Sequence, residues 1–190
     1  MRLILASASP RRIDLLARIG VVPDAVVPAD IDESVPRAEL PRDHALRLAR
    51  EKAEAIARRH ADSLVLAADT VVAVGRRILP KAEDEATLRA CMRLLSGRRH
   101  RVLTGVALAA PGRPLRTRLV ETTIAMKRLS EEEIDFYAAH GEWRGKAGGY
   151  ALQGYGEVYV RHIAGSYSNV VGLPLAETRT LLKSAGYPIA

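Results

Sequence analysis

The stretch LVLAADTVVAV, residues 64–74, predicts a β-strand that carries two polar side chains through an otherwise apolar run. Asp69 and Thr70 stand in the middle of it, and the apolar pattern resumes at Val71 and continues to a turn at Gly75. A carboxylate at such a position is either paired structurally or part of a functional site, because charged side chains are rarely buried alone. Asp69 is therefore the first candidate for chemistry.

Strands and helices alternate on both sides of this stretch. Further strands are predicted at 2–6, 25–27, 102–109, 115–126 and 158–163, helices at 10–19, 42–61, 85–95, 131–140 and 174–186, and a glycine-rich loop at 141–156. The two strands between residues 102 and 126 follow one another directly, which predicts a hairpin. This order predicts an α/β fold with a mixed sheet. The chain has 190 residues and no repeat or linker, so we expect one domain spanning residues 1–190.

The overall charge favours a partner that bears phosphate. The net charge is +7 and the pI is near 9.9. Part of the excess is arginine spread along predicted helix faces, as at Arg47, Arg50, Arg58 and Arg59. The sequence has no basic tail, no RNA-binding aromatic motif and no zinc-finger spacing, so a nucleic-acid polymer is not required.

The single cysteine, Cys91, falls in an apolar stripe with Leu88, Met92 and Leu95 at helical spacing, which predicts a core residue. One thiol cannot form an internal disulfide, as expected in a reducing compartment. The apolar run at residues 3–6 is too short for a signal peptide, and no run approaches the length of a membrane span. We expect a cytoplasmic protein without a membrane partner.

The stretch LASASPRR, residues 5–12, places Arg11 and Arg12 in the first turn of a predicted helix. Each cation there costs roughly 0.3–1 kcal/mol against the helix dipole. Bound phosphate removes this cost, because helix N-termini and arginine forks both bind phosphate oxygens. The alternative is a pair of solvated surface arginines with Asp14 or Glu33 as a partner.

Other charged residues could join such a site. Lys52, on the apolar-leaning side of its helix, and Lys81, after the sequence ILP, could converge on phosphate; taken singly, each is more simply a lysine whose stem covers apolar surface. The five histidines lack zinc-ligand spacing. Oxygen donors that could hold Mg²⁺ together with substrate phosphates are Asp30, Asp32, Glu33 and Asp69.

Two other phosphate-handling classes fit the sequence poorly. Asp30-x-Asp32-x-Ser34 is loosely similar to the aspartyl-phosphate phosphatases, but Pro28 breaks the strand that should present the first aspartate. A Walker motif is missing from the sequence, and the glycines at 145–149 do not link a strand to a helix.

Seven stretches, in order along nearly the whole chain, resemble the Maf family of nucleoside triphosphate pyrophosphatases. They are LASASPRR, LAREKA, LAADTVV, ILPKAED, LSGRRHRVLTGVAL, KAGGYALQGYG and GSYSNVVGLPL. The last two resemble the branch that acts on dTTP and UTP. Ala82 and Ala151 depart from the family pattern without removing a functional group. The resemblance implies a Maf/ITPase-like fold, in which an elongated mixed β-sheet is flanked by helices.

The resemblance also implies roles for particular residues. Asp69 would be the catalytic proton acceptor, and Arg11, Thr70 and Gln153 would select the base. The phosphate-binding set would be Ser7, Arg11, Arg12, Lys52 and Lys81, and the metal would be Mg²⁺ or Mn²⁺ held by Glu33 and Asp69. The expected reaction converts a nucleoside triphosphate to the monophosphate and pyrophosphate, and the family suggests a homodimer.

One alternative comes from a different class. The family takes its name from inhibition of septum formation, and the chain is basic. It could therefore be a regulatory or nucleic-acid-binding module that affects cell division without turnover. Steep salt dependence of DNA binding would be the mark of that class.

Overall fold

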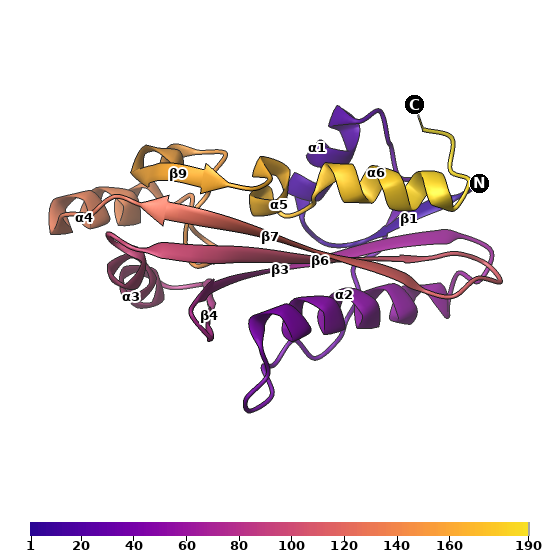
Figure 1. Ribbon diagram of the computed structural model, residues 1–190, viewed down its shortest axis with the longest axis horizontal. Coiled ribbons are helices and arrows are strands. Elements are labelled where there is room, and N and C mark those ends of the chain that lie inside the picture. Colours follow the sequence, from indigo (N-terminus) through magenta and orange to yellow (C-terminus); the bar gives the residue numbers. More distant parts are fainter. Residues whose placement is uncertain (190) are drawn as a thin grey trace.

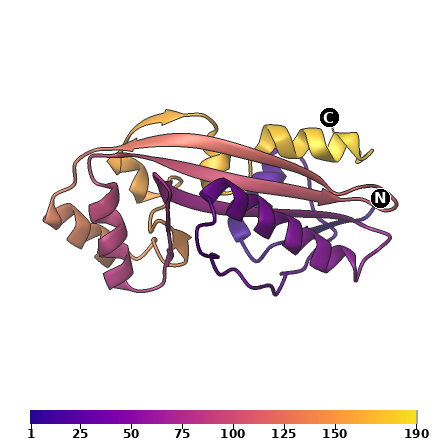
Figure 2. The same cartoon turned by 60° about the horizontal axis from the view of Figure 1, so that its bottom comes forward.

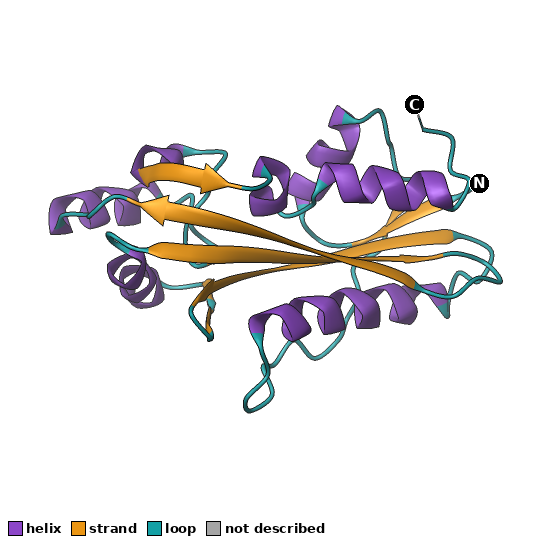
Figure 3. Ribbon diagram, viewed as in Figure 1, coloured by secondary structure: helices purple, strands orange, loops and turns teal. Residues whose placement is uncertain are grey.

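The computed structural model describes residues 1–189. Its main sheet contains β1 (Leu3–Ala6), β2 (Ala25–Val26), β3 (Leu64–Val74), β4 (Arg77–Leu79), β6 (Arg99–Ala109), β7 (Arg116–Met126) and β9 (Val160–Ala164). The strand order is β2-β1-β3-β6-β7-β9, with β4 pairing beside β3. β1 is parallel to β2 and β3, and the other pairs are antiparallel. The sheet runs along the long axis of the molecule (Figures 1 and 3), so the predicted elongated mixed sheet is confirmed.

Helices cover both faces of this sheet (Figures 1 and 2). They are α1 (Pro10–Arg18), α2 (Pro41–Ala57), α3 (Glu85–Leu95), α4 (Glu131–His140), α5 (Tyr167–Val171) and α6 (Leu175–Ser184), with a 3₁₀ helix η1 at Tyr155–Tyr159. A small second sheet pairs β5 (Lys81–Ala82) with β8 (Lys146–Ala147). No helix among residues 1–189 combines the length and the apolar character that crossing a membrane requires.

Successive residues of β3 serve opposite faces of the sheet, as the pleat requires. Leu64 and Leu66 pack in the core formed with α1 and α6. Val65 and Ala67 pack instead against the alanines of α2. Continuing this alternation places Asp69 on the α2 face and Thr70 on the α1 face.

The edge of β3 is unpaired where these two residues lie. β1 pairs with β3 only as far as Ala67, and β4 pairs with it only from Val72 onward. Between these points, residues 68–71 are paired with β6 on the other side alone. The carboxyl end of a parallel strand is where ligands bind in α/β sheets, because the chain leaves the sheet there and opens a crevice.

Most predicted elements are present, with differences at their ends. The predicted hairpin is confirmed as β6 and β7, and the capping box of Ser130 and Glu133 starts α4. α2 ends at Ala57 rather than at residue 61, because i→i+3 bonds tighten the chain there into a turn. The strand predicted at 158–163 starts at Val160, after η1. The sequence patterns do not predict β4, β5, β8 or α5, because each is short and carries no clear apolar periodicity.

Gly105 on β6 lets α2 lie close to the sheet. A Cβ atom at this position would stand 2.2 Å from the backbone oxygen of Ala45, in the second turn of α2. Since that atom belongs to the main chain, the whole helix would have to move to make room. The glycine thus sets the depth at which α2 presents its side chains to β3.

We predict that Gly105→Ala destabilises the protein. The added methyl group overpacks the interface between α2 and the sheet, at a cost of about 1–3 kcal/mol. Urea denaturation followed by circular dichroism measures the change in the free energy of unfolding. A midpoint equal to that of the wild type would contradict the close contact.

Candidate active site

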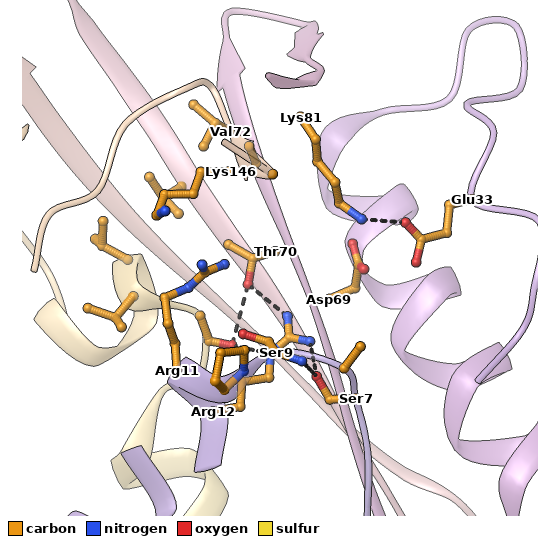
Figure 4. A pocket seen from close by; sticks show the side chains of 18 of the residues that line it. Ser7, Ser9, Arg11, Arg12, Glu33, Asp69, Thr70, Val72, Lys81 and Lys146 are labelled. Carbon is orange, nitrogen blue, oxygen red and sulfur yellow. Dashed lines mark hydrogen bonds and ion pairs between the residues drawn. The ribbon is translucent and has the colours of Figure 1, made fainter. Parts of the chain in front are cut away.

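A cavity of about 350 Å³ opens at the unpaired edge of β3. The segment that follows β1, the start of α1 and the end of α5 form one side of it, and residues 145–153 form another. Figure 4 shows side chains from these segments pointing toward one another around Asp69 and Thr70. Because the edge is open here, neighbouring residues from opposite faces of one strand reach the same space.

Two lysines and two carboxylates form a continuous ion-pair cluster in this cavity. The Nζ atom of Lys52 lies 2.6 Å from Oδ1 of Asp69 and 2.6 Å from Oε1 of Glu33. Lys81 donates to the other carboxylate oxygen of Glu33 at 2.7 Å. The side chains of Lys52 and Asp69 are each only 9% exposed, whereas Glu33 is 38% exposed.

Glu33 is held in its charged form by this cluster. Burial raises the pKa of its carboxyl, but hydrogen bonds and charges from Lys52 and Lys81 outweigh burial and lower the pKa to about 2. The carboxylate therefore bridges the two ammonium groups throughout the neutral pH range.

Arg12 is fixed by contacts with three segments of the chain. Its Nε donates to the Gly172 carbonyl at 2.9 Å, and its two other nitrogens donate to Ser7 Oγ at 2.9 Å and Thr70 Oγ1 at 3.4 Å. Burial lowers the pKa of Arg12, an effect that the charge of Asp69 opposes. Arg12 is therefore not the solvated surface arginine of the alternative interpretation.

Arg11 extends from the same helical turn toward the region of Thr70 (Figure 4). Burial lowers its pKa as well. Ser9 is the N-cap residue of α1, but its side chain makes no capping hydrogen bond, and the first turn of α1 contains no acidic residue. The start of α1 therefore faces the cavity with its positive dipole end uncompensated by a local carboxylate.

Thr70 belongs to a buried network of polar side chains that connects β3, β6, β7 and α5. Its Oγ1 lies 3.0 Å from Oγ1 of Thr104 on β6, and Thr104 donates to the backbone oxygen of Asn169 on α5. Asn169 in turn donates to Val102 O and Thr122 Oγ1. These bonds tie α5, and with it Gly172, to the sheet beneath the cavity.

Gln153 lies at the exposed rim of the cavity. The segment that carries it is anchored by Glu142, whose carboxylate accepts hydrogen bonds from the Tyr155 and Gly156 amides and from the Tyr137 hydroxyl. Apolar groups line the wall nearby, namely Val72, Val102, Tyr150, Leu152 and Val170. The rim thus combines an exposed side-chain amide with an apolar surface suited to a flat ring.

The structure brings every predicted site residue to this one cavity: Ser7, Arg11, Arg12, Glu33, Lys52, Asp69, Thr70, Lys81 and Gln153. Lys146 lines it as well, and the sequence interpretation had not singled it out, although it opens the quoted motif KAGGYALQGYG. Burial lowers the pKa of Lys146, and the charge of Arg11 adds to this effect. Five cationic side chains therefore face two carboxylates, an excess that suits a polyanion.

Among the described residues, the carboxylates that line the cavity are Glu33 and Asp69. Asp30 and Asp32 do not line the cavity, and Asp32 accepts hydrogen bonds from Ser34 instead. Within residues 1–189, no group of three or more His, Cys, Asp or Glu side chains could hold a metal ion. Glu33 and Asp69 alone nevertheless fit Mg²⁺, which usually takes one or two carboxylates together with substrate phosphates and water.

Comparison with known proteins bears on the fold and on the family of the chain. A solved HAM1 protein from Coxiella burnetii matches with a TM-score of 0.53 and 15% identity, over 97% of this chain and 100% of that one, which is a likeness of fold alone. The chain is thus an α/β protein that shares the fold of this HAM1 protein and has a cationic cavity beside its central strand. A family model described as Maf-like protein matches residues 2–185, and the chain belongs to the Maf family.

Curated relatives extend over nearly the same length. A protein of Caulobacter vibrioides is 63% identical over 185 residues, covering 97% of this chain and 96% of its own. One from Zymomonas mobilis is 58% identical over 188 residues, covering 99% and 93%. Both relatives are named dTTP/UTP pyrophosphatase.

We predict that Lys52→Met destabilises the protein by about 3–5 kcal/mol at neutral pH, because it leaves the Asp69 carboxylate buried without its partner. Adding Asp69→Asn to this variant should recover part of the loss. Lys127→Met is the matched control, since it breaks a more exposed ion pair with Glu133 and should cost about 1 kcal/mol or less. Urea denaturation measures all three; equal losses for Lys52→Met and Lys127→Met would contradict the buried pair.

Proposed function

We propose that this protein is a dTTP/UTP pyrophosphatase that converts a pyrimidine nucleoside triphosphate to the monophosphate and pyrophosphate. The observation that carries the proposal is the pairing of a buried carboxylate, Asp69, with a cavity lined by five cations. The names of the full-length relatives support the choice of substrate. We infer that residues 1–190 act as one domain in the cytoplasm, a location suited to the single thiol of Cys91.

The triphosphate is bound by the cations around the start of α1 and β3. Arg11, Arg12 and Ser7 lie on one side of the cavity and Lys81 lies on another (Figure 4). Lys52 lines the cavity next to its partners Asp69 and Glu33. Charge-assisted hydrogen bonds to phosphate are shorter and stronger than neutral ones. They also stabilise the charge that develops on the leaving pyrophosphate.

Asp69 acts as the general base of the reaction. Water attacks the α-phosphorus, a new phosphorus–oxygen bond forms, and the bond to the oxygen bridging the α- and β-phosphorus atoms breaks. The proton of the water passes to Asp69, and the electron pair of the broken bond leaves with pyrophosphate. Lys52, 2.6 Å from Oδ1, holds the carboxylate in place.

Glu33 and Asp69 would hold a divalent cation, Mg²⁺ or Mn²⁺, together with the substrate phosphates. When bound, such an ion supplies Lewis-acid stabilisation of phosphoryl oxygens. Lys52 and Lys81 keep both oxygens of Glu33 directed into the cavity, so this carboxylate is oriented before any ligand arrives.

The base is selected at the rim. Gln153 offers an amide donor and acceptor that suit the O4 and N3–H groups of uracil or thymine. Thr70 and Arg11 line the same cavity as Gln153 and complete the specificity set. The family resemblance also implies a homodimer, which analytical ultracentrifugation would test.

A panel of nucleoside triphosphates with Mg²⁺, assayed separately for pyrophosphate and phosphate, tests the proposed function. We expect UTP and dTTP to be hydrolysed with release of pyrophosphate alone, and CTP to be a poor substrate because its edge reverses the donor and acceptor pattern. Release of phosphate alone would contradict cleavage between the α- and β-phosphorus atoms. Salt-dependent DNA binding without turnover would favour a regulatory module instead.

Asp69→Asn should separate chemistry from binding. The amide keeps the size of the side chain but cannot take the proton from water, so kcat should fall by about 10²- to 10⁴-fold. Asp14→Asn, an exposed change on α1, is the control and should retain full turnover. Calorimetry with an unreactive UTP analogue, with and without Mg²⁺, reports any change in binding. Near-normal turnover by folded Asp69→Asn would end the proposed mechanism.

A further inference from the structure

Glu33 reaches the cavity from a segment without regular secondary structure. Residues 27–40 connect β2 to α2 and contain neither helix nor strand. Ala38 within it has a left-handed backbone, with φ of 68°. Contacts with the body of the fold restrict the conformational freedom of such a segment. The position of Glu33 therefore depends on what holds this loop.

Arg47 on α2 holds the loop from outside the cavity. Its Nε donates to Glu39 Oε1 at 2.7 Å, and its Nη2 donates to Glu39 Oε2 at 3.1 Å and to the backbone oxygen of Ser34 at 3.0 Å. Its Nη1 lies 3.2 Å from Glu51 Oε2. The planar guanidinium is thus used on all three nitrogens, an arrangement that lysine cannot reproduce.

The carboxylate of Glu39 has a second partner on α2, the side chain of His44. Nδ1 of His44 lies 2.6 Å from Oε2 of Glu39, and the side chains of both residues are nearly buried. Hydrogen bonds from Arg47 are the main cause of the lowered pKa of Glu39. Arg47 and His44 therefore bind one end of the loop to the first half of α2.

The same helix carries Lys52, which binds the Glu33 side chain. Arg47 donates a hydrogen bond to the backbone oxygen of Ser34, the residue directly after Glu33. Residues of α2 therefore hold both the main chain next to Glu33 and the Glu33 side chain. A small misplacement of a group at an active site can cost about 10²-fold in rate. The sequence had suggested only a surface charge at Arg47; the structure gives it a specific set of partners.

We propose that Arg47 is a positioning residue of the active site, which sets the location of Glu33 at the lysines by clamping Ser34 and Glu39 to α2. The inference rests on the proposed function for its kinetic consequence. Arg47 itself does not line the cavity. Its effect on the cavity must therefore pass through the loop, and Glu33 is the charged loop residue that lines the cavity.

A double-mutant cycle tests this dependence. Arg47→Gln should lower kcat/KM for UTP by about tenfold in the wild type but by less than about twofold when Glu33 is already Gln, because residues that act through one another are not additive. The kcat/KM of Arg47→Lys should lie between those of the wild type and Arg47→Gln, since lysine keeps the charge but lacks the forked guanidinium. Arg50→Gln, an exposed change on the same helix, should have no effect. Equal losses in both backgrounds would overturn the proposal.

Hydrogen exchange gives a readout that does not depend on activity. The amides of Ser34 and Glu39 are bonded within the loop, to Asp32 Oδ1 and Pro36 O. Arg47→Gln should speed their exchange at least about tenfold while the amides of β3 keep their protection. Unchanged loop protection would overturn the clamp, whereas a wild type that releases no pyrophosphate but shows this pattern would overturn only the proposed function.

Discussion

The gap in pairing along the edge of β3 is the constraint on which the site depends. Asp69 and Thr70 project from opposite faces of β3, and a strand paired along this edge would separate the spaces that their side chains face. Because β1 stops at Ala67 and β4 begins at Val72, the two side chains instead open onto one cavity. The helix that follows β1 then brings its arginines to the same place, as the carboxyl end of a parallel strand allows.

Charge balance explains the arrangement of the cavity without substrate. Lys52 cannot be buried alone, because desolvation of an ammonium group costs several kcal/mol. Its contacts with Asp69 and Glu33 offset this cost and also orient both carboxylates. Arg12 is held by hydroxyl and carbonyl oxygens, which leave its charge unneutralised. The cavity therefore keeps an excess of positive charge that a bound triphosphate would neutralise, as the proposed function requires.

Elements far from the cavity set its geometry. Gly105 fixes how closely α2 approaches the sheet, and α2 carries both Lys52 and Arg47. Asn169 ties the end of α5 to the sheet under Thr70. Each of these contacts restricts the positions that a side chain in the cavity can take, and such positioning contributes to reaction rate.

The sequence by itself determined the elements whose signals are local. Apolar periodicity predicted the longer helices and strands, and family motifs predicted the residues that gather at Asp69. Only the tertiary structure decided which contacts join segments far apart, because no local pattern encodes them. The role of Arg47 comes from a loop that folds back on α2, and the short β4 is a strand only because β3 lies beside it. Register and loop closure are long-range properties, and they place adjacent residues of β3 in a single site.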